Sequence, residues 1–171
     1  MSQPRVLVAG VGNIFLGDDA FGVEVVRRLA GRAQPEGVRV VDFGIRGLDL
    51  LYTLLDGCQS VILVDAVPRG GPPGTLYLLE IEGDAGEAVP ESGPMIDTHD
   101  LDPAKVLRLA GAMGARVERL LLVGCEPSPL ADTDDLQTGM SEAVQRAVEE
   151  AVPLVESLAR RLLDGEAIGQ R

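Results

Sequence analysis

The sequence predicts a three-layer α/β/α sandwich with a five-stranded, mostly parallel sheet, because strand-like and helix-like segments alternate from one end to the other. Short runs such as RVLVA at residues 5–9 and SVILVDA at residues 60–66 are apolar on both faces, as in strands covered on both sides. Between the strands, apolar residues recur every three or four positions, which is the period of an amphipathic helix. The length of 171 residues suits a single domain, 1–171.

Each element follows from this alternation and from the turn residues that bound it. The predicted strands are residues 5–9, 38–43, 60–66, 75–82 and 118–124. The predicted helices are residues 19 to about 32, 47–55, 101–113 and 141–163. Residues 75–82 follow a Pro/Gly cluster and carry acids at their end, which is typical of an edge strand. Pro153 lies off the apolar stripe of the last helix and should kink it rather than end it.

Composition excludes several classes of protein. The net charge of −12, from 27 acids against 15 bases, would repel a phosphate backbone, so we expect no nucleic acid partner. Apolar runs are only as long as a strand, far below the roughly 20 residues of a membrane span, and the N-terminus shows no signal-peptide pattern. We therefore expect a cytoplasmic protein with no membrane partner. Cys58 and Cys125 lie too far apart to suggest a chelating pair.

Polar residues stand where the predicted strands end, at the edge where ligands bind in sheets of this type. A Gly-Val-Gly-Asn run follows the first strand, Asp42 the second, Asp65 the third, and Cys125-Glu126 the last. This clustering predicts an active site at the carboxyl edge of the sheet.

A dinucleotide loop is one interpretation of the GxG after the first strand. Phe15 stands where the GxGxxG pattern requires its third glycine, and Asp18 and Asp19 at the start of the next helix would repel a pyrophosphate. Asp42 could serve as the ribose-binding acid, so the nucleotide reading remains a minor alternative.

A metal site explains the acids better. One Asp suffices to cap a helix, so we expect Asp18 as the cap and Asp19, about 100° around the helix, facing the cleft. A carboxylate such as Asp65, ending a strand that is apolar on both faces, needs a cation or several donors. The lone His99 precedes a helix, whose dipole favours the neutral imidazole that metals bind. Asp19, Asp65 and His99 together suit a borderline ion such as Zn²⁺ or Ni²⁺.

Several motifs, in this order, resemble those of the hydrogenase maturation endopeptidases. The matching segments are VLVAGVGNIFLGDDAFGVEVVRRL at 6–29, DFGIRGLDLL at 42–51, VILVDA at 61–66, PPGT at 72–75, Thr98-His99 and VGCEP at 123–127. The resemblance covers residues 5–163, which we take as the core of the domain. It implies a phosphorylase/hydrolase-like fold in which the strand near residues 75–82 is antiparallel.

The resemblance also implies a function. Such proteins remove the C-terminal extension of a nickel–iron hydrogenase large-subunit precursor after nickel insertion, an activity classed as aspartic-type endopeptidase. The family's metal-binding and catalytic residues fall on Asp19, Asp65 and His99. The ion is expected to be nickel supplied by the precursor, although other divalent transition metals can occupy such a site. We expect a monomer that binds this precursor.

Two departures from the family pattern concern recognition and an accessory ligand. The loop containing Asp42, Gly44, Arg46 and Gly47 is expected to recognise the substrate, but Ile45 replaces its usual Thr. Cys125, where relatives often carry an aliphatic residue or Gln, is either a soft accessory ligand or, as we favour, a buried neutral thiol. Two other functions stay open: a nickel-binding maturation chaperone without cleavage, and a general metal-dependent peptidase or amidase.

Overall fold

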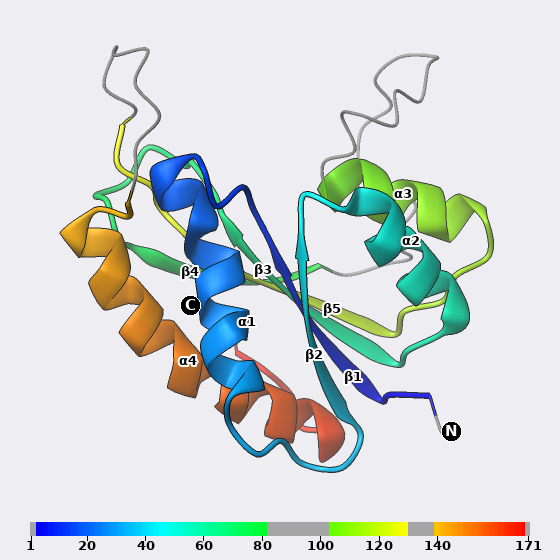
Figure 1. Cartoon of the computed structure of the whole chain (residues 1–171). Helices are drawn as coiled ribbons and strands as arrows, with labels where there is room; N and C mark the ends of the chain where they lie inside the picture. The colour runs from blue at the N-terminus through cyan, green and yellow to red at the C-terminus, as the bar shows by residue number, and fades with distance from the viewer. Residues whose placement is uncertain (1–2, 82–102, 130–138, 170–171) are drawn as a thin grey trace.

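The computed structural model describes residues 3–81, 103–129 and 139–169, and it confirms the predicted fold. Five strands form one sheet: β1 (Val6–Val11), β2 (Val38–Gly44), β3 (Ser60–Ala66), β4 (Leu76–Ile81) and β5 (Arg119–Cys125). The helices are η1 (Gly17–Ala20), which is a 3₁₀ turn, α1 (Phe21–Ala30), α2 (Gly47–Asp56), α3 (Pro103–Ala112) and α4 (Glu142–Leu163). Figure 1 shows α1 and α4 on one face of the sheet and α2 and α3 on the other.

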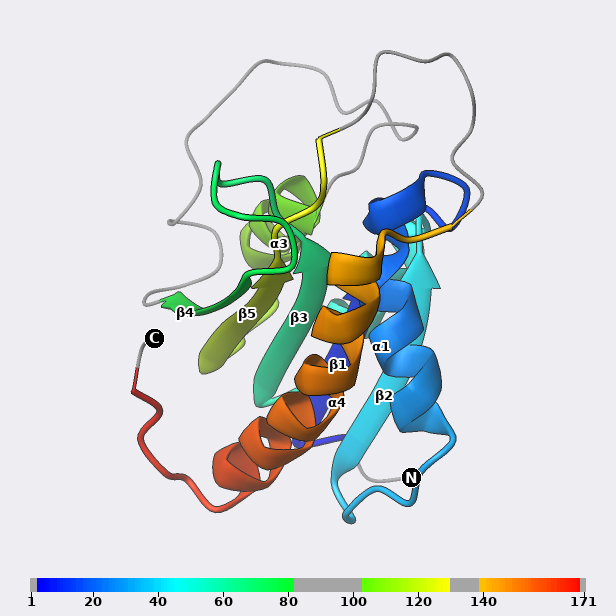
Figure 2. The same ribbon diagram turned by 90° about the vertical axis from the view of Figure 1, so that its left-hand side faces the viewer.

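The strand order across the sheet is β2-β1-β3-β5-β4, which Figure 2 shows from the side. The first four of these strands are parallel, and β4 runs antiparallel to β5 at the edge, as expected. From β1 the chain passes first to β2 on one side and then to β3 on the other. The carboxyl ends of β1 and β3 therefore form the switch point at which ligands bind in open α/β sheets.

The apolar strands separate two cores. Because side chains alternate along a strand, Val6 and Val8 of β1 face one helical layer, and Leu7 and Ala9 face the other. The larger core is built mainly from α1, α4 and the strand faces that they cover, and the smaller one from α2, α3 and the opposite faces. Cys58 is a buried member of the smaller core, and Cys125 is fully buried in the larger one.

The start of α1, beside the two aspartates of the predicted site, differs from the prediction. The α-helix expected from residue 19 begins only at Phe21, because residues 17–20 form η1. Helix α4 begins after its N-cap Ser141, as expected, and continues through Pro153. In the described part of the chain, no helix combines the length and apolar character that crossing a bilayer requires.

Candidate functional site

Two glycines bring η1 against the ends of β1 and β3. A Cβ on Gly22, in the first turn of α1, would lie 2.1 Å from the backbone oxygen of Val64 and 2.5 Å from that of Val11. Gly12 has a φ of +144°, and a Cβ there would lie 2.0 Å from the backbone oxygen of Asp19. Only glycine permits these approaches, so the GxG and the glycine after the two aspartates are explained by packing.

Asp19 lies beside a pocket of about 580 Å³ at the carboxyl edge of the sheet. Its Oδ2 accepts a hydrogen bond of 2.8 Å from the backbone N–H of Asn13, which fixes the side chain against the turn that follows β1. The pocket is lined by Leu16, Asp18, Asp19, Ala66, Pro68, Gly70, Gly71, Pro73, Glu126, Pro127, Ser128 and Pro129. Backbone and rigid proline rings therefore make up much of its wall.

Asp65 reaches the same edge from β3. It is the penultimate residue of that strand, pairs in register with Gly124 of β5, and is half-buried. The next residue, Ala66, lines the pocket. The structure thus places two of the three expected metal ligands at the switch point, and His99 lies outside the described residues. Within residues 3–81, 103–129 and 139–169, no three His, Cys, Asp or Glu side chains are grouped to hold a metal ion.

The expectation that Asp18 caps the following helix is wrong. Neither η1 nor α1 has a side-chain cap, and the Asp18 carboxylate, only 7% exposed, points to other segments. Its Oδ1 accepts from the backbone N–H of Ser141 at 2.7 Å, and its Oδ2 accepts from the backbone N–H of Ser128 at 2.8 Å. The Ser141 hydroxyl also donates to Oδ2, at 3.0 Å. These contacts satisfy a buried charge that would otherwise be costly.

Glu126 holds the opposite wall of the pocket. Its carboxylate is 5% exposed and accepts hydrogen bonds from the backbone N–H groups of Arg69 at 2.8 Å and Gly70 at 3.0 Å, and from the Tyr77 hydroxyl at 2.8 Å. The backbone hydrogen bond from Arg69 is the main reason that the pKa of Glu126 lies below its usual value. The hydrogen bond to Glu126 correspondingly raises the pKa of Tyr77. Glu126 is therefore an ionised anchor for the loop at residues 69–71.

Cys125 is a buried neutral thiol, as we favoured. Its side chain is fully buried, and burial raises its pKa to about 12, with smaller contributions from the carboxylates of Asp18 and Glu126. Its place is in the larger core rather than in the pocket lining. Burial likewise raises the pKa of Cys58, to about 11.

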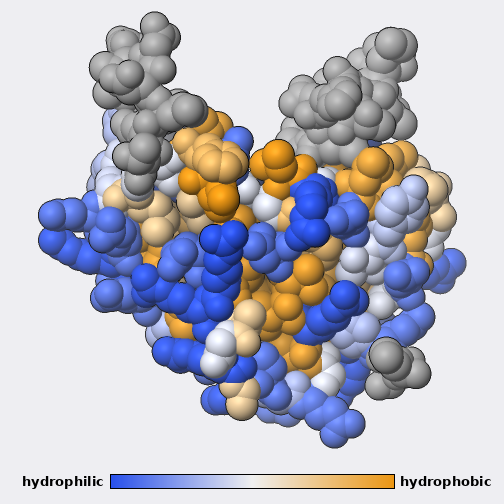
Figure 3. All heavy atoms as spheres, viewed as in Figure 1, coloured by the Kyte–Doolittle hydropathy of each residue, from blue (hydrophilic) through white to orange (hydrophobic). Residues whose placement is uncertain are grey.

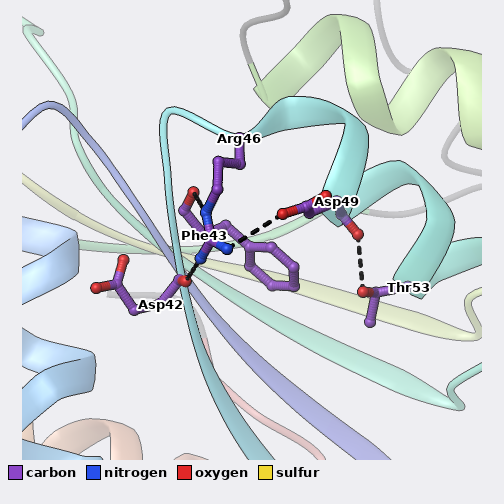
Figure 4. Close-up of polar contacts among 5 residues, drawn as sticks. All are labelled: Asp42, Phe43, Arg46, Asp49 and Thr53. Carbon is purple, nitrogen blue, oxygen red and sulfur yellow. Dashed lines mark hydrogen bonds and ion pairs between the residues drawn. The ribbon is translucent and has the colours of Figure 1, made fainter.

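The loop between β2 and α2 does not line this pocket, and the Arg46 side chain binds neighbouring residues within the same segment (Figure 4). The guanidinium of Arg46 donates to the backbone oxygens of Asp42 and Phe43 and pairs with the carboxylate of Asp49 at 3.1 Å. The Asp42 side chain pairs with Arg27 of α1 at 3.2 Å. Asp42, Gly44 and Arg46 line a separate, smaller pocket of about 260 Å³, where the neighbouring Ile45 is 75% exposed.

Sequence reasoning missed the anchoring roles of Asp18 and Glu126. The sequence pattern predicts Asp18 as a helix cap and Glu126 only as a polar residue at a strand end. No local signal points to these roles, because the donors that bind each carboxylate lie in distant segments of the chain. The donors that bind Asp18 come from residues more than 100 positions away, so their proximity depends on the fold.

An acid-bearing pocket at the switch point of a doubly wound sheet is the layout of an α/β enzyme. A family model described as hydrogenase maturation protease matches residues 23–158. The chain belongs to the hydrogenase maturation protease family.

Individual relatives agree with this assignment. A Methanocaldococcus jannaschii protein described as a hydrogenase maturation protease is 31% identical over 91% of this chain and 96% of its own length. The hydrogenase 2 maturation protease of Escherichia coli is 30% identical over 96% of this chain and 98% of its own. The solved structure of the hydrogenase maturating endopeptidase HybD from E. coli has a TM-score of 0.73 and 31% identity, covering 92% of this chain and 93% of that one.

Proposed function

We propose that this protease removes the C-terminal extension of a nickel–iron hydrogenase large-subunit precursor after nickel has been inserted, and that it recognises the bound nickel through Asp19, Asp65 and His99. We also propose that it acts in the cytoplasm as a monomer. One observation supports the proposal. Asp19 of η1 and Asp65 of β3 lie at the same edge of the sheet, beside the 580 Å³ pocket.

The donor set suits a metal that arrives with the substrate. Two carboxylates and one imidazole leave coordination positions open, and a borderline ion such as Ni²⁺ accepts both oxygen and nitrogen ligands. The thiol of Cys125 does not complete a resident cage, because it is fully buried in the larger core and does not line the pocket. Thiolates carried by the precursor would instead supply the remaining ligands.

The chemistry required is hydrolysis of one peptide bond. A water molecule must lose a proton as it attacks the scissile carbonyl, and Asp19 or Asp65 is the natural base in this site. The hydrogen bond from the Asn13 N–H holds Asp19 in one orientation, as a positioned base requires.

A protein substrate also fits the surface at this edge. The exposed large apolar side chains include Ile14, Phe15 and Leu16 in the turn after β1, and Ile45 and Leu48 at the start of α2. Figure 3 shows apolar side chains along the upper edge of this face, and more of them in the middle of the face, between α1 and α2. An exposed group of apolar side chains beside a pocket is typical of a protein-binding site.

The test is a processing assay on a purified large-subunit precursor, loaded with nickel or left without it. Mass spectrometry should show loss of the C-terminal peptide from the nickel-loaded precursor only. Asp19→Asn, Asp65→Asn and His99→Ala should each abolish processing while circular dichroism and the melting temperature remain close to those of the wild type.

Glu156→Gln is a suitable control, because Glu156 is a partly buried acid of α4 that pairs with Arg32 at 2.5 Å and does not line the pocket. Wild-type processing by His99→Ala would refute the three-ligand site. Stable binding of the loaded precursor without cleavage would favour the chaperone function, and cleavage of unrelated peptides would favour a general peptidase.

A further inference from the structure

The carboxylate of Asp18 connects three segments that are distant in the sequence. It lies in η1, accepts from the first residues beyond β5 through the N–H of Ser128, and accepts from the N-cap of α4 through Ser141. The Ser141 hydroxyl, in turn, accepts from the N–H of Val144 at 3.4 Å. A single buried side chain therefore joins η1, the exit of β5 and the start of α4.

The 3₁₀ geometry of η1 separates the roles of its two aspartates. With three residues per turn, adjacent side chains point about 120° apart. Asp18 is accordingly directed at Ser128 and Ser141, and Asp19 is directed at the turn after β1, where Asn13 binds it. The two residues share a peptide unit, so a movement of Asp18 is passed to Asp19, whose backbone has little room to adjust beside Gly12.

Both ends of one of these hydrogen bonds form part of the pocket. Asp18 and Ser128 line it, together with Asp19 and with Pro127 and Pro129 on either side of Ser128. The proline rings cannot donate backbone hydrogen bonds, so the N–H of Ser128 is the donor available in this stretch of the wall. The bond between Asp18 and Ser128 thus joins the turn that carries Asp19 to the part of the pocket wall formed by residues 127–129.

We propose that Asp18 is a positioning residue: by binding Ser128 and Ser141 it holds Asp19 at a fixed distance from the pocket wall where the substrate lies. The inference rests on the proposed function for the role of Asp19, but the hydrogen-bonded connection can be measured without any substrate. Asp18 itself takes no proton and touches no reacting atom in this scheme.

The test compares Asp18→Asn, Ser141→Ala and the double variant with the wild type. An Asn at position 18 keeps one acceptor oxygen but turns an N–H₂ group toward donors, so at least one connection is lost. We expect kcat for precursor processing to fall about 10- to 100-fold, the loss associated with a misplacement of about 1 Å, while KM changes much less. Ser141→Ala removes the hydroxyl donor but keeps the backbone N–H that binds Asp18, so it should reduce kcat less. Adding it to Asp18→Asn should lower kcat little further, because Asp18 already holds residue 141 poorly in that variant; the lost cap of α4 should lower the melting temperature instead.

Amide hydrogen exchange supplies a reading that is independent of activity. The N–H groups of Ser128 and Ser141 should exchange faster in Asp18→Asn than in the wild type, and the N–H of Asn13, bound by Asp19, should follow them. Glu156→Gln is the matched control: it removes an ion pair between α4 and Arg32, just beyond α1, but leaves η1 untouched, so kcat should not change.

The possible outcomes distinguish a failure of the positioning role of Asp18 from a failure of the proposed processing function. Faster exchange in Asp18→Asn with a kcat equal to that of the wild type, or a loss confined to thermal stability, would overturn the positioning role and leave the proposed function intact. Unchanged exchange at Ser128 and Ser141 would show that the connection does not exist in solution. A wild-type protein that processes no precursor would refute the proposed function, and the exchange data would still decide whether Asp18 holds the two serines.

Discussion

Gly22→Ala should displace the candidate site by a steric clash with the sheet. The added Cβ would lie 2.1 Å from the oxygen of Val64 and 2.5 Å from that of Val11. A carbon atom normally stays about 3.3 Å from a carbonyl oxygen, so the start of α1 must move by about 1 Å. Neither oxygen can yield easily, because both belong to the backbone of the sheet.

The size of the effect follows from two opposing contributions. Overpacking a well-packed core costs about 1–3 kcal/mol, and a clash with backbone on two strands belongs near the upper end. Replacing glycine by alanine in a helix stabilises the helix by at most about 1 kcal/mol, because alanine has the higher helix propensity. We therefore expect a net loss of about 2 kcal/mol, which for a domain of this size lowers the melting temperature by about 4–8 °C.

Thermal unfolding followed by circular dichroism measures this loss, and Gly31→Ala is its matched control. Gly31 caps the other end of α1 with a φ of −79°, and a Cβ there would lie 3.5 Å from its nearest neighbour, the oxygen of Arg28. That variant should stay within about 0.5 kcal/mol of the wild type. If Gly22→Ala proved as stable and as active as Gly31→Ala, the explanation of the glycine by close packing would be refuted.

Three further predictions concern other parts of the molecule. Cys58 and Cys125 should resist thiol reagents in the native protein at pH 8 and react after unfolding, because burial raises their pKa values to about 11 and about 12; rapid reaction of the native protein would contradict this. Glu126→Gln should destabilise the protein at pH 7 in urea titrations, since a carboxylate with a lowered pKa stabilises the fold above its unfolded value of 4.5. The difference from the wild type should shrink as the pH falls below that value, and a constant difference would count against an ionised Glu126. Arg46→Ala should alter which large-subunit precursors are processed more than the rate on a good one, because it releases the loop that exposes Ile45; an unchanged range in a panel of precursors would argue against that role.

The sequence predicted the strands of this protein well, because parallel strands covered on both sides need continuous apolar runs and the turns between them are marked by Gly and Pro. The start of α1 was less predictable. The amphipathic pattern that begins near residue 19 fits an α-helix, but η1 occupies residues 17–20 because Gly12 and Gly22 draw this segment onto the strand ends. Packing between distant backbones has no counterpart in a local pattern.

The site was predictable only in part, for a related reason. Asp19 and Asp65 could be placed at the sheet edge because the carboxyl ends of parallel strands lie together. The role of Asp18 could not, because its donors on Ser128 and Ser141 become neighbours only after β5 and α4 have packed. Whether Asp19, Asp65 and His99 bind metal together stays a prediction.

The hydrogen bonds between Asp18 and Ser141 also have a consequence for folding during synthesis on the ribosome. The two residues are 123 positions apart, and the second lies at the start of the long final helix. A nascent chain can therefore form β1, η1 and β3 well before the partner of Asp18 has left the exit tunnel. Until Ser141 is synthesised, the Asp18 carboxylate lacks the two hydrogen bonds that this residue donates, although Asn13 can already bind Asp19. The hydrogen bonds to Asp18 are thus completed only after most of the chain has been made, so a chain that ends before residue 141 should leave this carboxylate without two of its donors.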